Sequence, residues 1–360
     1  MMARIWDEVA AFRRGGAMPG TPGSLAETPD RRPSGPDVLS EMLKAVRLTG
    51  SVFLNACLTA PFGVIDPKFY AERTPMARLR HISILHLIVA GGCSFETAGR
   101  QRAVTAGDLI FLPFPGPYKF WNGEPERMAD ASEVVRPGRI EGVWTVNHGG
   151  GGAEVHMVCG FIESAELLFA PVFRTLPPLL IERTTEDRVG ALIASTVREI
   201  VTLVEAATPG TQAVLGRLME LLFVELLRRH IARLPAGSQG WFAALNDPVV
   251  GRALQLLHAE PAHRWTVEEI AGRIGSSRTV VADRFKALLG RPPIDYLAGW
   301  RIQLAAERLR LGHESVPSIA ASVGYESETA FNRAFKRLTG MTPGSWRDAS
   351  GVPSTPSATS

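Results

Sequence analysis

Two segments of the chain, residues 278–286 and 328–336, carry polar and charged side chains at matching positions. Such side chains can bind DNA when one helix face presents them: Asn332 matches the N6/N7 edge of adenine, and Arg333 matches the O6/N7 edge of guanine. Lysine and arginine beside such a face suit phosphate. The pattern predicts DNA contacts from Arg278, Thr279, Ala282, Asp283, Lys286, Glu328, Thr329, Asn332, Arg333 and Lys336.

Both segments belong to a longer repeat. "TVEEIAGRIG" (266–275) aligns with "SVPSIAASVG" (315–324), and each copy continues through a serine, Ser277 or Ser327, into a second helical segment. A helix, a turn at glycine, a serine cap and a second helix form the helix-turn-helix unit, whose second helix enters the major groove. Helical solenoids also repeat short phrases, but the paired serine caps and the basic residues outside favour DNA binding.

Helical periodicity sorts the residues of the two second helices into inward and outward positions. Between the units, residues 294–312 are rich in helix formers and predict one rigid spacer, in which Arg301 is expected to tie the two halves through a carboxylate. Asp283 occupies the position that Arg333 holds in the second copy. It could accept from cytosine N4 or orient a neighbour. The inward positions are Val281, Phe285, Leu288, Leu289, Phe331, Ala334, Phe335 and Leu338.

The first half of the chain has a different pattern. Short apolar runs broken by glycine and proline predict β-strands of an antiparallel barrel or jelly roll. Helical periodicity then takes over in residues 187–206 and 211–233, and the second of these is apolar around most of its circumference. The strand candidates are "SVFLNACL", "HISILHLIVA", "CSFETA", "DLIFLPF" and "EVHMVCGFI".

The C-terminal pattern resembles the DNA-binding domain of the AraC/XylS family of bacterial transcription regulators. "RFKALLGRPPIDYLAGWRIQLAAERL" (284–309) and "IAASVGYESETAFNRAFKRLTGMTPGSWR" (319–347) carry the resemblance. The first half resembles, more loosely, the cupin-type sensor domain of one AraC subfamily. The resemblance implies an α+β protein of two domains, with double-stranded DNA and RNA polymerase as partners, a small-molecule effector of unknown identity, and a homodimer as one option.

A metal-binding cupin uses two histidines, a glutamate and a later histidine. His86 fits the first position, but Ile88, Cys93 and Tyr118 stand at or near the others, so we expect no metal, no cofactor and no enzymatic activity. A ligand pocket lined by His86, Tyr118 and Trp121 is the expectation instead. Two alternatives stay open: redox sensing through Cys93 and Cys159, and a cupin enzyme fused to a DNA-binding module.

The composition of the chain is compatible with a DNA-binding protein. The net charge is only +3, so positive charge that attracts DNA must be local. Three widely spaced cysteines and the lack of a recognisable signal peptide predict a cytoplasmic protein without membrane contact. The predicted organisation is a disordered segment (1–37), a cupin-like sensor domain (38–234) with a helical dimerisation segment (187–233), a linker (235–245), a double helix-turn-helix domain (246–348) and a disordered tail (349–360).

Overall fold

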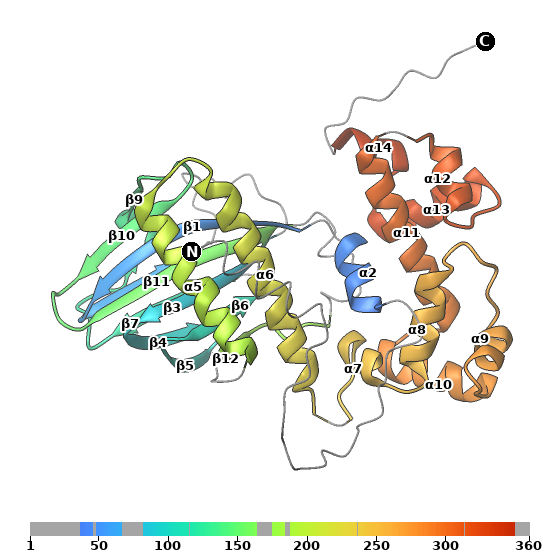
Figure 1. The fold of residues 1–360 in the computed structure, drawn as a ribbon, viewed down its shortest axis with the longest axis horizontal. Helices are drawn as coiled ribbons and strands as arrows, with labels where there is room; N and C mark the ends of the chain where they lie inside the picture. Colours follow the sequence, from blue (N-terminus) through green and yellow to red (C-terminus); the bar gives the residue numbers. More distant parts are fainter. Residues whose placement is uncertain are drawn as a thin grey trace, which may run out of the picture. The chain divides into compact units, whose positions relative to one another are not determined.

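The computed structural model describes residues 37–45, 48–66, 82–114, 116–163, 175–183, 188–235, 237–312 and 314–349 (Figure 1). The two segments expected to be disordered, 1–37 and 349–360, therefore lie outside the described residues except for Asp37 and Ala349.

The N-terminal half consists of two β-sheets around a shared apolar core, a jelly-roll-like arrangement and not one closed barrel. The five predicted strand segments each contain a strand, whereas most of the shorter strands were not anticipated. The larger sheet has the order β12-β6-β3-β11-β1-β10-β9. Its strands are β1 (Thr49–Thr59), β3 (Ile82–Ala90), β6 (Asp108–Leu112), β9 (Val135–Pro137), β10 (Trp144–Gly149), β11 (Glu154–Glu163) and β12 (Leu180–Arg183).

The smaller sheet has the order β5-β4-β7-β2-β8. Its register brings Phe95 of one strand beside Phe120 of the next, and both rings are buried in the core. A short helix, α3 (Ala131–Val134), follows its last strand. The strands are β2 (Phe62–Asp66), β4 (Gly92–Thr97), β5 (Arg100–Thr105), β7 (Tyr118–Asn122) and β8 (Ala129–Asp130).

Strand β3 is buried on both faces, so most of its side chains are apolar. Ile84 and Ile88 belong to the core between the sheets, while Leu85 and Leu87 belong to the core beneath the helices. His86 therefore shares the inward face with Ile84 and Ile88, because side chains alternate along a strand.

Helices α5 (Arg188–Ala206) and α6 (Thr211–Ala232) cover the outer face of the larger sheet (Figure 1). Helix α6 crosses β1 at very short range: a Cβ atom added at Gly50 would lie 2.5 Å from the carbonyl oxygen of Gly216, and one at Gly216 would lie 2.6 Å from that of Gly50. Any side chain at either position would push the helix off the sheet. On the opposite side of α6, Val214 and Leu221 are exposed.

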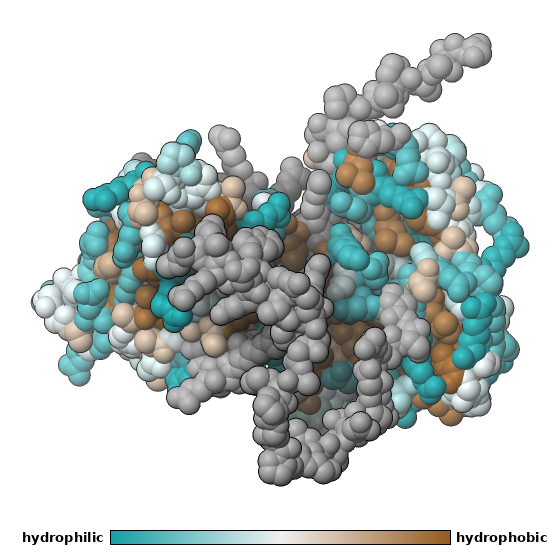
Figure 2. Space-filling view, viewed as in Figure 1, coloured by the Kyte–Doolittle hydropathy of each residue, from teal (hydrophilic) through white to brown (hydrophobic). Residues whose placement is uncertain are grey.

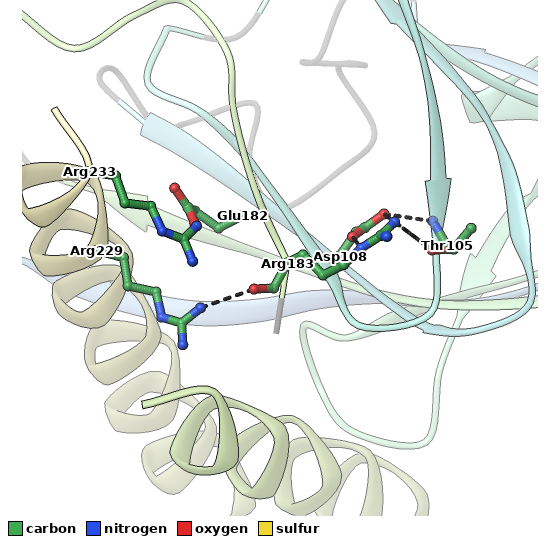
Figure 3. Close-up of polar contacts among 6 residues, drawn as sticks. All are labelled: Thr105, Asp108, Glu182, Arg183, Arg229 and Arg233. Carbon is green, nitrogen blue, oxygen red and sulfur yellow. Dashed lines mark hydrogen bonds and ion pairs between the residues drawn. The ribbon is translucent and has the colours of Figure 1, made fainter. Parts of the chain in front are cut away.

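Polar contacts anchor the C-terminal end of α6 to the edge of the larger sheet (Figure 3). Arg229 donates to the backbone carbonyl of Arg183 at 3.0 Å, and Arg233 forms an ion pair with Glu182. Asp108 pairs with the guanidinium of Arg183 at 2.9 Å and accepts from the backbone N–H of Thr105 at 2.8 Å. Since Asp108 and Glu182 are buried, these pairings compensate carboxylates that would otherwise lack solvation.

The C-terminal domain is helical. Residues 241–245, predicted from the sequence to be part of the linker, belong to the helix α7 (Trp241–Asn246). Trp241 is fully buried, and its Nε1 donates to the hydroxyl of Tyr296 at 3.0 Å. The remaining helices are α8 (Val250–Ala259), α9 (Val267–Arg273), α10 (Arg278–Leu289), α11 (Pro293–Leu311), α12 (Val316–Ser322), α13 (Glu328–Thr339) and α14 (Pro343–Ala349).

An N-terminal helix, α2 (Val38–Ala45), packs on this helical domain although the chain continues from it into β1. Met42 is fully buried, and the buried amide of Gln303 in α11 donates to the carbonyl oxygen of Ala45 at 3.0 Å. Figure 2 shows mainly hydrophilic side chains along the edge of the helical domain that carries α9 and α12. None of the helices in the described ranges is long and apolar enough to cross a membrane.

Candidate functional site

The first helix-turn-helix unit is formed by α9 and α10. Ser277 caps α10, as predicted, by accepting from the backbone N–H of Val280 at 3.2 Å. Gly275, in the turn before it, has a φ of +67°, which favours glycine. Val281 and Phe285 are fully buried and fix the helix on its scaffold, while Leu288 and Leu289 are half-buried.

The second unit is formed by α12 and α13. Ser327 caps α13 by accepting from the N–H of Ala330 at 3.2 Å, and Phe331 and Phe335 are fully buried. Gly324, in its turn, has a φ of +88°, and a Cβ atom there would lie 2.6 Å from the carbonyl oxygen of Ala262. The turn of the second unit thus packs directly against the segment that precedes α9.

Arg301 of α11 joins the two units through backbone carbonyls and not through a carboxylate, which corrects the expectation. Its guanidinium donates to Pro261 at 2.7 Å and His263 at 2.8 Å on the first-unit side, and to Gly324 at 3.1 Å in the turn of the second. Three fixed acceptors match the planar guanidinium fork, so Arg301 sets the spacing between the two units.

Helix α13, the second helix of the second unit, presents most of its predicted DNA-contacting residues to solvent. Glu328, Thr329, Arg333 and Lys336 are exposed. Among the described residues, Arg333 makes no ion pair, and the nearby Glu326 pairs with Arg264 instead. The guanidinium of Arg333 is therefore available to an external acceptor.

The sequence did not predict two features of α13. Asn332 is only half-exposed, and its Oδ1 is buried and accepts no hydrogen bond from the residues that the structure describes, so one side of its amide faces the protein. Arg337, absent from the predicted set, is exposed beside Lys336. Because Arg337 directly follows the predicted contact Lys336, the sequence could have indicated it as a further contact.

In helix α10, the second helix of the first unit, some of the arginine side chains are already paired within the protein. Arg278, Thr279, Asp283 and Lys286 are exposed, and Ala282 is half-buried. Arg278 pairs with Glu268 of α9 at 2.6 Å. Arg284, which the sequence did not single out, forms an ion pair with Asp247 and so anchors α10 to the start of α8.

The N-terminal domain contains a cavity of about 90 Å³ between its sheets. Of the three predicted ligand-binding residues, His86 and Tyr118 line it and Trp121 does not. Because side chains alternate along β7, Tyr118 and Phe120 face the cavity, while Trp121 lies with Lys119, whose Nζ is 5.3 Å from the indole ring. Cys159 and Asp66, unpredicted as ligand contacts, also line the cavity.

His86 is the central polar residue of this cavity. Its Nδ1 lies 2.9 Å from Sγ of Cys159, and its ring packs edge-on against Tyr118 and Phe120 at centroid distances of 4.9 and 5.1 Å. Burial lowers the pKa of His86 to about 3, so its imidazole is neutral at physiological pH. Tyr118 in turn donates to Oδ2 of Asp66 at 3.3 Å.

The cysteines do not have the environment of a redox sensor. Cys93 and Cys159 lie in different sheets, and both are buried. Burial raises the pKa of Cys93 to about 12 and also raises the pKa of Cys159, which disfavours the reactive thiolate. In the part of the chain that the structure describes, no cluster of three or more histidine, cysteine, aspartate or glutamate residues could hold a metal ion.

Two family models match the chain: the cupin model over residues 37–232 and the helix-turn-helix domain model over residues 250–349. A Streptomyces lividans protein named as an AraC-like transcription regulator is 34% identical over 263 residues, covering 71% of this chain and 84% of the relative.

Two further relatives support this match. A Streptomyces antibioticus protein with the same description is 49% identical over 127 residues, or 35% of this chain and 42% of the relative. The transcriptional regulator AlkR of Acinetobacter baylyi is 29% identical over 276 residues, or 74% of this chain and 88% of the relative.

Proposed function

The chain belongs to the AraC-like transcription regulators, and from this premise we propose that its two recognition helices, α10 and α13, read the major groove of a DNA operator in response to an effector held by the cupin domain. The observation that carries the proposal is the duplicated unit. Both copies have the same serine cap and the same buried phenylalanine, and both leave polar or basic side chains exposed on the second helix.

The two units contribute unequally to this proposed readout. In α13, Arg333 is exposed and unpaired among the described residues, so it can read a guanine edge. In α10, Arg278 already pairs with Glu268, while Asp283 and Thr279 offer fewer base contacts. We assign specificity mainly to α13, and phosphate contacts to Lys286, Lys336 and the newly identified Arg337.

The proposal includes three further partners: an effector, a second copy of the chain and RNA polymerase. The effector is assigned to the cavity that His86 and Tyr118 line. A second copy of the chain is assigned to the exposed side of α6, where Val214 and Leu221 are solvent-accessible. Contact with RNA polymerase completes the proposal as the route to transcription control.

DNA binding is tested by selecting genomic fragments with the full-length protein and measuring affinity by fluorescence anisotropy across a salt series. We expect a specific set of fragments and an affinity that falls steeply with salt, because lysine and arginine release counterions from phosphate. The triple variant Lys286→Ala, Lys336→Ala and Arg337→Ala should flatten the salt slope. Arg139→Ala, at an exposed arginine between β9 and β10 of the N-terminal domain, is the control and should leave the salt slope unchanged. Failure to enrich any fragment would refute the proposal.

A further inference from the structure

The cavity between the two sheets contains a buried polar atom that makes no hydrogen bond within the described part of the chain. This atom is Nε2 of His86; the other ring nitrogen faces Cys159. Native proteins rarely bury a polar atom without a partner. Since His86 lines the cavity, a bound molecule can supply the missing partner.

The walls around this atom are apolar. Phe53, Leu54, Val64, Phe120 and Met157 are among the side chains that line the cavity. Its volume of about 90 Å³ is smaller than the roughly 150 Å³ apolar cavity known to hold benzene. A bound molecule can therefore be no larger than about one ring.

The charged residues of the described wall disfavour an anion. The described lining residues include no lysine or arginine, and both acidic residues, Asp66 and Asp130, already accept hydrogen bonds. Tyr118 donates to Asp66, and Ser132 donates to Asp130 from both its backbone N–H, at 2.9 Å, and its hydroxyl, at 2.6 Å. A carboxylate or phosphate in this cavity would find no lysine or arginine among the described lining residues to pair with.

We propose that this cavity binds a small, neutral, mostly apolar molecule through one hydrogen bond to Nε2 of His86. The proposal rests on the proposed sensor role of the cupin domain and names the chemical class of its effector. A hydroxyl group fits best, because it can donate to Nε2 or accept from it, whichever ring nitrogen carries the proton.

The test uses four one-ring probes with the full-length protein: benzyl alcohol, toluene, benzoate and benzylamine. Affinities are measured by calorimetry, without DNA, so that the result does not depend on operator binding. Benzyl alcohol should bind several-fold more tightly than toluene and at least tenfold more tightly than benzoate, and benzylamine should not bind more tightly than benzyl alcohol. The strongest response from a charged probe, or no response to any probe, would overturn the proposal.

Variants locate the hydrogen bond. In His86→Leu, the preference for benzyl alcohol over toluene should disappear while toluene still binds. His156→Leu is the matched control: His156 bonds to Asn55 on the same sheet but does not line the cavity, so the preference should persist. An unchanged preference in His86→Leu would refute the assignment.

A second measurement does not depend on a folded variant. The ¹⁵N shift of the His86 Nε2 atom in the wild-type protein should move on adding benzyl alcohol and not on adding benzoate. A shift that does not respond to benzyl alcohol would count against the proposal. Failure of the proposed regulatory function would be seen separately, as loss of operator selection by a protein that still binds benzyl alcohol.

Discussion

At the scale of single residues, Arg333 and Lys336 are neighbours on α13 with different expected roles. Both are exposed. Arg333→Ala should cost about 1–3 kcal/mol on the selected operator and relax the preference at one base pair, because the paired hydrogen bonds to guanine are lost. Binding to a library of randomised sites measures this.

Lys336→Ala provides the comparison for Arg333. A phosphate contact contributes equally to all sequences, so its loss should weaken binding uniformly and reduce the salt slope by roughly one unit. If Arg333→Ala also weakened binding uniformly and left base preferences intact, Arg333 would be a backbone-contacting residue.

His258 makes the stability of the protein sensitive to pH. It is stacked on Trp300 with ring centroids 4.1 Å apart, and its Nε2 lies 2.7 Å from the hydroxyl of Tyr296, which already accepts from Trp241. That hydroxyl donates to Nε2, so the imidazole must be unprotonated there. Burial lowers the pKa of His258 to about 3.

The sign of the pH effect follows from this lowered pKa. The unfolded chain, with a histidine pKa of about 6.5, binds more protons than the folded one between pH 6.5 and pH 3, so the free energy of unfolding falls as the pH falls through this range. From pH 7 to pH 5, His258 should lower it by about 2 kcal/mol. Urea unfolding at both pH values measures the loss, and His258→Gln should reduce it; an equal loss in the variant would contradict the prediction.

Arg301 links the two helix-turn-helix units, so its removal should be costly. Arg301→Lys keeps the charge but cannot reach all three carbonyl oxygens, and we expect a loss of about 3 kcal/mol in unfolding free energy. Arg252→Ala is the control, because within the described ranges this exposed arginine bonds only to the carbonyl oxygen of Pro248, next to its own helix. If Arg301→Lys changed the unfolding free energy by less than about 0.5 kcal/mol, the three hydrogen bonds of Arg301 would not be needed for stability.

At the scale of elements, α7 decides where the DNA-binding domain begins. Trp241 and Phe242 are buried, so a fragment that starts after them lacks part of its core. A fragment of residues 238–349 should be about 3–5 kcal/mol more stable than one of residues 247–349. Thermal melts followed by circular dichroism compare them, with Trp241→Ala in the longer fragment as the matched variant. Equal stability of all three would show that α7 is dispensable.

At the scale of the whole molecule, the two helix-turn-helix units joined by α11 should bind successive major-groove segments about 10–10.5 base pairs apart. Inserting five base pairs between the two halves of a mapped monomer site turns one half to the opposite face of the DNA, so tight binding should be lost. Replacing five central base pairs without changing the length is the control and should be tolerated. Retained affinity after the insertion would mean that only one helix-turn-helix unit binds DNA.

The sequence by itself was enough for the features that repeat or alternate locally. The duplicated phrase identified both helix-turn-helix units, their serine caps and their buried phenylalanines, because caps and helical periodicity depend on residues only three or four apart. The longer apolar runs located the main strands for the same reason. Resemblance to a known family then supplied the two-domain fold, which the family comparisons support.

Tertiary structure decided what depends on residues distant in the chain. The acceptors of Arg301 are backbone carbonyls, which any sequence contains, so no residue type could reveal them. The contact between His86 and Cys159 arises from the pairing of β3 with β11, and the face on which Trp121 lies depends on the register of β7. Shifting a strand by one residue exchanges its two faces, and register is fixed by packing across the whole sheet.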